Sequence, residues 1–272
     1  MIFKELGNTG EEIPAIGLGT WGVGGFETAD HSNDAQLVKT IEEAIGLGYK
    51  LIDTAEYYAC GHTEEIVGEA IKNFDRDKLF IVTKVWPNHL SKTELPKALS
   101  GSLKRLNLDY VDLYLIHWPS SKIPLNETIE TMIKLKSKGL IRHIGVSNFD
   151  TSLLKKAVEI SDDQVVNNQV LFNMEHREPE RELLPYCIEH GITLTAYSPL
   201  ERTNLLSETK RKLTVVANNH NSSIYQLMLA WLLSKERVVT IPKSTNINHL
   251  RENLKAANIK LNSDELRFLD EK

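Results

Sequence analysis

The feature that most constrains the fold is a regular alternation of short apolar segments with longer amphipathic segments through most of the chain. The short segments have the length of strands, and the longer ones carry apolar residues at helical spacing. The expected strands are 16–19, 49–52, 79–85, 111–116, 141–146, 165–170, 192–197 and 238–241. The expected helices are 33–47, 63–73, 92–106, 126–138, 151–160, 180–190, 208–219, 223–235, 247–256 and 263–270. Thr63, Asp150 and Ser263 are expected to cap three of these helices.

Strands that alternate with helices in this way predict a parallel sheet. Eight such units within 272 residues fit a closed (β/α)₈ TIM barrel. An open, doubly wound sheet is the alternative. Residues 2–6 and 12–15 are expected to form a hairpin in front of the barrel, and two helices exceed the eight that a barrel needs. Because no linker-like stretch divides the chain, one domain is expected over residues 1–272.

Composition and charge exclude several classes of function. The formal net charge is −5 and the isoelectric point is about 6.0, so nucleic acid or membrane binding is not expected. No signal peptide or membrane-spanning stretch is recognised. The two cysteines, Cys60 and Cys187, have no ligand-like spacing, which favours reduced thiols in a cytoplasmic protein. Cys60 lies near the candidate site, where it is either a reactive thiol or simply a small loop residue.

Polar and aromatic residues follow the expected strands, where the loops of a TIM barrel form its active site. They are Trp21, Asp53, Tyr58, Lys84, Trp86, His117, Trp118, Ser147, Asn148, Gln169, Tyr197, Ser198, Lys243 and Ser244.

Tyr58, Lys84, Asp53 and His117 form a candidate proton-transfer set. A lysine ammonium group next to a phenol lowers the pKa of the phenol, and a buried lysine needs an anion such as Asp53. His117 could then hydrogen-bond a substrate oxygen. Each residue also has an ordinary structural explanation, and Tyr57 is an alternative phenol. Their joint position at strand ends favours the catalytic interpretation.

The tryptophans Trp21, Trp86 and Trp118 all fall at loop starts. Each could be a core residue, but together at one rim they predict an aromatic mouth for apolar or aromatic carbonyl compounds.

Residues 17–22 (GLGTWG) match the dinucleotide fingerprint G-x-G-x-x-G. That fingerprint requires a helix to start at once, whereas a loop of about ten residues follows here, so the match is not expected to bind a dinucleotide. No metal-ligand cluster is recognised in the sequence; Glu189 and His190 lack a second ligand pair.

Over essentially its whole length the sequence resembles the aldo-keto reductases. The resemblance rests on residues 17–21 (GLGTW), 51–55 (LIDTA) with Tyr58 five beyond Asp53, 82–86 (VTKVW), 113–119 (LYLIHWP), 144–149 (IGVSNF), 168–169 (NQ), 196–200 (AYSPL) and 241–244 (IPKS). It implies a barrel enzyme that reduces aldehydes, ketones or aldoses with NADPH.

The resemblance also implies roles for individual residues. Tyr58 corresponds to the proton donor, Lys84 and Asp53 tune it, and His117 orients the carbonyl group. Trp21, Tyr58, Trp86, His117 and Trp118 are expected to contact the substrate. The residues expected to contact the cofactor are Thr20, Trp21, Asp53, Ser147, Asn148, Gln169, Tyr197, Ser198, Pro199, Leu200, Lys243, Ser244, Thr245, His249, Glu252 and Asn253.

The sequence departs from the family pattern in three places. His249 stands where an arginine usually helps to bind the 2′-phosphate, which makes NADH a possible cofactor besides NADPH. Residues 59–62 (ACGH) replace the usual residues after the tyrosine, so the loop is expected to differ in shape. The chain ends within the last expected helix, without the long C-terminal loop of many animal members, which implies an open pocket and broad specificity.

The sequence is compatible with three hypotheses about function. The first is a reductase, and the second is an alcohol or sugar dehydrogenase that uses the same residues in the opposite direction. The third is a non-catalytic, cofactor-binding interaction protein of the same fold. A monomer is expected, because no spare apolar stripe requires a partner.

Overall fold

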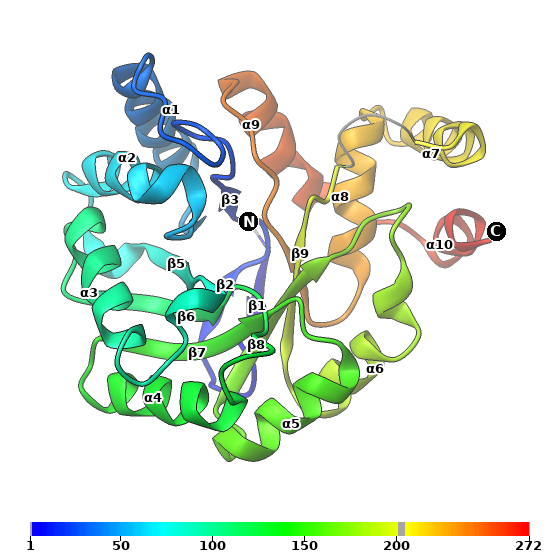
Figure 1. Ribbon diagram of the computed structural model, residues 1–272. Helices are drawn as coiled ribbons and strands as arrows, with labels where there is room; N and C mark the ends of the chain where they lie inside the picture. Colours follow the sequence, from blue (N-terminus) through cyan, green and yellow to red (C-terminus); the bar gives the residue numbers. More distant parts are fainter. Residues whose placement is uncertain (1, 201–204, 272) are drawn as a thin grey trace.

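The computed structural model describes residues 2–200 and 205–271, and within them eight parallel strands form one sheet (Figure 1). The strands are β3 (Leu18–Gly19), β4 (Leu51–Asp53), β5 (Phe80–Val85), β6 (Val111–Ile116), β7 (Ile141–Ser147), β8 (Val165–Leu171), β9 (Thr193–Tyr197) and β10 (Val238–Thr240). Each strand pairs with the next one along the chain. A doubly wound sheet would reverse its strand order, so the barrel prediction is confirmed and the open sheet is excluded.

The sheet closes between its last and first strands. Ile16, just before β3, forms a parallel bridge with Thr240 of β10. The amide of Gly17 donates to the Thr240 carbonyl at 2.8 Å, and the amide of Thr240 donates to the Ala15 carbonyl at 2.9 Å. These bonds complete the ring of strands.

Helices surround the strands in Figure 1. They are α1 (Asp34–Leu47), α2 (His62–Ile71), α3 (Leu95–Leu106), α4 (Leu125–Ser137), α5 (Thr151–Ser161), α6 (Leu183–Glu189), α7 (Ser207–Asn219), α8 (Ile224–Ser234), α9 (Ile247–Lys255) and α10 (Ser263–Asp270). In α3 the buried residues Leu95, Leu99, Leu103 and Leu106 recur every three or four positions, which gives the helix one face toward the sheet.

The N-terminal hairpin of β1 (Phe3–Glu5) and β2 (Glu12–Pro14) closes the amino end of the barrel. Leu6 and Ile13 of the hairpin are buried among the residues that fill the barrel interior. The Gly7 amide donates to Thr193 Oγ1 of β9 at 2.8 Å. Because this end is covered, the opposite end of the strands is the one that can open to substrates.

The expected helix caps are partly correct. The side chain of Asp150 accepts from the Leu153 amide and caps α5, as expected. Asn262, not Ser263, caps α10 through a reciprocal capping box with Glu265. Thr63 does not cap α2, because its hydroxyl is buried and donates to the Val23 carbonyl.

Candidate active site

A buried lysine joins a carboxylate and a phenol at the carboxyl end of the barrel. Lys84 Nζ of β5 lies 2.5 Å from Asp53 Oδ1 of β4, 3.0 Å from the Tyr58 hydroxyl and 2.8 Å from the Thr54 carbonyl. All three ammonium protons therefore have acceptors. Lys84 is fully buried and Asp53 is 1% exposed, so this is an ion pair within the protein interior. The predicted association of these three residues is confirmed.

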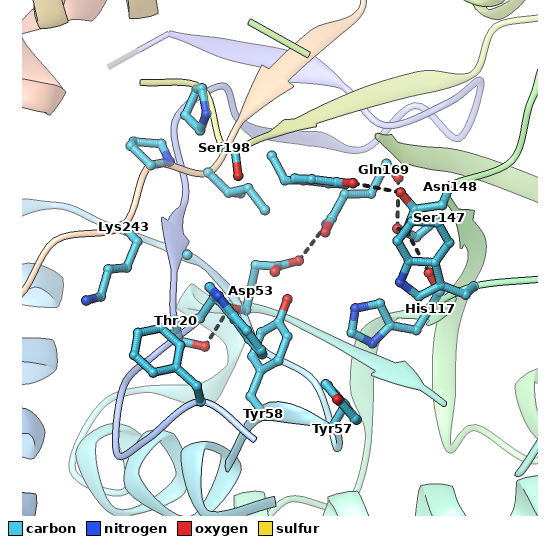
Figure 2. Close-up of a pocket in the computed structure, with 18 of the residues that line it drawn as sticks. Thr20, Asp53, Tyr57, Tyr58, His117, Ser147, Asn148, Gln169, Ser198 and Lys243 are labelled. Carbon is cyan, nitrogen blue, oxygen red and sulfur yellow. Dashed lines mark hydrogen bonds between the residues drawn. The ribbon is translucent and has the colours of Figure 1, made fainter. Parts of the chain in front are cut away.

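Both oxygens of Asp53 are occupied by protein donors. Gln169 Nε2 of β8 donates to Asp53 Oδ2 at 2.7 Å (Figure 2), while Lys84 occupies Oδ1. The backbone carbonyl of Asp53 accepts from the Thr20 hydroxyl at 2.8 Å. Asp53 is thus held in a fixed position as the counter-ion of Lys84.

Charge and burial act against each other in this group. Burial would lower the pKa of Lys84, but the neighbouring Asp53 and Tyr58 outweigh it and raise that pKa, so the lysine is an ammonium group. Burial raises the pKa of Tyr58, while the Lys84 ammonium opposes this and Asp53 adds to it. The net shift is upward, contrary to the expected lowering, because desolvation of the phenolate outweighs the lysine. Tyr58 is therefore a neutral phenol at physiological pH.

His117, at the end of β6, lies beside Tyr58. The two ring centroids are 5.7 Å apart and the rings are nearly perpendicular. Burial, together with the positive charge of Lys84, lowers the pKa of His117 to about 2. The imidazole is therefore neutral, and its Nδ1 atom has no hydrogen-bond partner among the described residues. Such a ring can donate one hydrogen bond to a ligand but cannot act as a cationic acid.

Polar side chains from β7, β8 and β9 form the far wall of the site (Figure 2). The Tyr197 hydroxyl donates to Asn148 Oδ1 at 2.9 Å, and Asn148 Nδ2 donates to the His117 carbonyl at 3.0 Å. Ser147 Oγ donates to the Gln169 carbonyl at 2.8 Å. Asn148 has a positive φ of 62°, a conformation that asparagine tolerates better than most residues. These bonds fix the side chains before any ligand binds.

These groups open into a cavity of about 600 Å³. Fifteen of the predicted residues line it: Thr20, Trp21, Asp53, Tyr58, Trp86, His117, Trp118, Ser147, Asn148, Gln169, Tyr197, Ser198, Pro199, Leu200 and Lys243. Lys84 lies behind this surface, hidden by Asp53 and Tyr58. Lys243 lies on the side of the cavity opposite His117 in Figure 2.

The remaining predicted residues lie outside this cavity. Ser244 and Thr245 border a much smaller space beside Thr20. His249 and Glu252 are exposed on α9. Asn253 is only 4% exposed, because α9 packs it against α1 and the core, so the side chain is not open to a ligand in this conformation.

Aromatic rings form the mouth of the cavity, as expected, but two of them were not predicted to contact the substrate. Tyr57 stacks on Trp86 at 3.8 Å between ring centroids and lies parallel to Trp21 at 6.3 Å. Phe26, 54% exposed, packs edge-on against Trp21. The position of Tyr57 could have been predicted from its place next to Tyr58. Phe26 could have been suspected because it is an aromatic residue within a glycine-rich loop.

The segment after Tyr58 has an unusual backbone. Ala59, Cys60 and Gly61 all have positive φ angles, of 48°, 54° and 91°. The Ala59 amide donates to the Phe26 carbonyl at 2.6 Å, and the exposed Cys60 thiol contacts the Glu27 carbonyl at 3.0 Å. This turn therefore joins Tyr58 to the loop of residues 20–33.

A phenol hydrogen-bonded to a buried ammonium–carboxylate pair, with a neutral imidazole beside it at the open end of a TM barrel, defines an acid–base site of the reductase type. The sequence model of the aldo/keto reductase family matches residues 15–272. The chain belongs to this family of oxidoreductases.

Several relatives share nearly the whole chain. Methylglyoxal reductase YeaE of Escherichia coli (strain K12) is 40% identical over 95% of this chain and 90% of its own length. Glyoxal reductase of Bacillus subtilis is 38% identical, covering 97% of this chain and 90% of its own. Among solved structures, the thermostable aldo-keto reductase Tm1743 with the inhibitor epalrestat has 57% identity and a TM-score of 0.98, covering 99% of both chains. An aldo/keto reductase of Klebsiella pneumoniae, solved with NADP and acetate, has 38% identity and a TM-score of 0.87, covering 97% of this chain and 93% of the other.

No helix among the described residues is both long enough and apolar enough to span a bilayer.

Proposed function

We propose that this protein reduces small aldehydes and ketones to alcohols with a reduced nicotinamide cofactor, with 2-oxoaldehydes such as methylglyoxal and glyoxal as its first candidate substrates. The observation that carries the proposal is the Tyr58 hydroxyl, which faces the cavity while it accepts a hydrogen bond from buried Lys84. The names of the relatives YeaE and glyoxal reductase support the choice of substrates.

The residues along the cavity fit a nicotinamide dinucleotide. Ser147, Asn148 and Gln169 offer hydroxyl and amide groups suited to a carboxamide, and the Tyr197 ring offers a flat surface for the nicotinamide. The backbone of residues 198–200 and the ammonium group of Lys243 lie further along the cavity, where phosphates are expected. Ser244, Thr245, His249 and Glu252 are candidates for the adenosine end; Asn253 would have to become exposed to join them. When bound, the reduced nicotinamide supplies the hydride.

NADPH is the preferred candidate, because related structures hold it and Lys243 is a suitable partner for the 2′-phosphate. NADH stays possible, because His249 replaces the usual arginine. Initial rates with both cofactors would decide between them.

The protein side chains would guide the proton. His117, neutral at physiological pH, donates a hydrogen bond to the substrate carbonyl oxygen and holds it near the Tyr58 hydroxyl. As the carbonyl carbon is reduced, negative charge develops on that oxygen, and Tyr58 gives up its proton to it. The phenolate left behind is stabilised by the adjacent Lys84 ammonium, whose own charge is balanced by Asp53.

The test compares Tyr58→Phe with Tyr57→Phe, because both phenols line the same cavity. Tyr58→Phe should lower kcat by ~10²–10⁴-fold, the usual contribution of a positioned acid. Tyr57→Phe keeps the stacked ring and should change kcat by less than about tenfold. Oxidation of NADPH by methylglyoxal, followed by absorbance, gives the rates, and calorimetry should show unchanged cofactor binding. Substantial turnover by Tyr58→Phe would refute the assignment of the proton donor.

A further inference from the structure

A second group of ionisable side chains lies outside the cavity, where the loop of residues 20–33 meets the start of α2. Two hydrogen bonds to carbonyl groups of the loop hold it there: Thr63 Oγ1 donates to the Val23 carbonyl at 2.7 Å, and the Ala59 amide donates to the Phe26 carbonyl at 2.6 Å. The same loop carries Trp21 and Phe26 to the cavity. A contact that fixes the loop at this junction therefore acts close to the mouth of the cavity, although its residues do not line the cavity.

Two histidines and an aspartate converge at this junction. Asp34, the first residue of α1, lies between them: its Oδ1 is 2.9 Å from His62 Nε2 and its Oδ2 is 3.1 Å from His31 Nδ1. The two imidazole rings lie 3.9 Å apart between centroids. One ligand atom from each residue lies within 4.8 Å of the other two. Ligand atoms of a tetrahedral zinc ion are about 3.4 Å apart, so small side-chain movements would bring all three to one ion.

His62 is oriented by a second carboxylate. Its Nδ1 atom lies 2.9 Å from Glu65 Oε2, one turn along α2, while Nε2 faces Asp34. Metal-binding histidines usually have this arrangement, in which one nitrogen binds the ion and the other donates to a carboxylate. The His62 side chain is 8% exposed, so the ring is held in a fixed position.

The group is also open to solvent on one side. The His31 side chain is 66% exposed and that of Asp34 is 37% exposed. An ion could enter from this side, and water could complete its coordination. Two imidazole nitrogens are borderline donors, and together with one carboxylate they suit Zn²⁺, Co²⁺, Ni²⁺ or Cu²⁺ better than Mg²⁺ or Ca²⁺, which prefer all-oxygen sites.

We propose that His31, Asp34 and His62 bind one divalent transition-metal ion, with Zn²⁺ as the representative, and that Glu65 positions His62. The ion would link the loop of residues 20–33 to the first residues of α1 and α2. It would have a structural role, distinct from the chemistry at Tyr58. The proposal does not depend on the proposed function, and it revises the sequence-based expectation that no metal is bound.

The experiment uses residues 1–272 without an affinity tag, treated with a chelator and then titrated with ZnCl₂ by calorimetry. One equivalent is expected to bind and to raise the melting temperature. Co²⁺ should give a d–d absorption spectrum typical of nitrogen and oxygen ligands. Both signals are independent of enzyme activity.

Variants distinguish the site from other histidines. His31→Ala removes an exposed ligand without threatening the fold, and it should weaken Zn²⁺ binding by at least ~10-fold. Asp34→Asn should do the same, and Glu65→Gln should weaken binding by ~10-fold through His62. His190→Gln, an exposed histidine stacked on Tyr186, is the matched control and should bind Zn²⁺ normally. No Zn²⁺ binding by the parent protein, or binding that His31→Ala and Asp34→Asn leave unchanged, would overturn the proposal.

Discussion

The buried Lys84–Asp53 pair allows a sharp test of how charge is balanced in the barrel. In Lys84→Met, the Asp53 carboxylate keeps only the donor from Gln169, and the buried Thr54 carbonyl loses its lysine donor. Removing one partner of a buried ion pair usually costs ~3–5 kcal/mol of unfolding free energy, because the other charge stays unpaired. Asp53→Asn leaves the ammonium group unpaired and should have a cost of the same order.

The double variant Lys84→Met/Asp53→Asn contains neither charge. Its loss of unfolding free energy should therefore be no larger than that of either single variant, which gives a coupling energy of about 3 kcal/mol or more. Independent effects would instead add up to ~6–10 kcal/mol.

Urea-induced unfolding of the four proteins, followed by fluorescence and circular dichroism, measures this cycle. Turnover provides the control: under the proposed mechanism it should stay low in the double variant, because Tyr58 then lacks the neighbouring Lys84 ammonium group. A double variant whose destabilisation equals the sum of the single ones would show that Lys84 and Asp53 are not coupled, and the reasoning would fail.

Three further predictions concern His117, Arg105 and His249. The pKa of His117 is about 2 in the folded protein but near its ordinary value of about 6.5 in the unfolded protein. Below about pH 6.5 the unfolded state therefore binds a proton that the folded state does not, and stability falls as the pH falls. The parent should lose ~2 kcal/mol more than His117→Gln between about pH 7 and about pH 5, measured by urea unfolding; equal losses would contradict the low pKa. Arg105→Met leaves fully buried Glu64 without its ion-pair partner and should lower the unfolding free energy by ~3 kcal/mol. The control Lys97→Met removes an exposed ion pair with Glu94 and should change it by less than ~0.5 kcal/mol in the same urea assay. His249→Arg should strengthen NADPH binding by roughly tenfold and leave NADH binding unchanged, as read by calorimetry; an equal effect on both cofactors would place His249 away from the 2′-phosphate.

The barrel could be predicted because its signal is repeated. Each strand is a short apolar run and each helix has one apolar face, so errors at element ends do not alter the order of elements. Parallel strands end at the same rim, which is why Asp53, Lys84, His117 and Gln169 meet although 116 positions separate the first from the last. Their polar character at strand ends was sufficient to place them in one site.

Features that depend on side-chain direction in loops could not be predicted in the same way. Tyr57 and Phe26 enter the cavity mouth because residues 20–33 fold onto the turn after Tyr58, and no periodic pattern encodes that contact. Glu64 belongs to the first turn of α2, where a carboxylate is normally exposed. Its burial is explained by the approach of Arg105 from α3 and by the Thr83 hydroxyl of β5, which donates to it. Likewise, the side chain of Asn253 is hidden by packing of α9, which helix periodicity alone did not reveal.

The turn after Tyr58 links these separate findings. Positive φ angles at Ala59 and Cys60 are unfavourable for residues with side chains, by about 1–2 kcal/mol each, so neighbouring contacts must hold them. The segment is fixed on three sides: Lys84 binds Tyr58, Arg105 binds Glu64, and the group of His31 and Asp34 binds His62. Gly61 has a φ of 91°, and a Cβ atom there would also lie 2.6 Å from Nε of Arg105, so both the backbone and its neighbour favour glycine at this position. Residues 59–62, one of the stretches expected to depart from the family pattern, are thus flanked on both sides by residues held in ion pairs or hydrogen bonds. A metal ion at His62 would strengthen one of these three restraints, and through the same short segment it would help to hold the Tyr58 hydroxyl at Lys84.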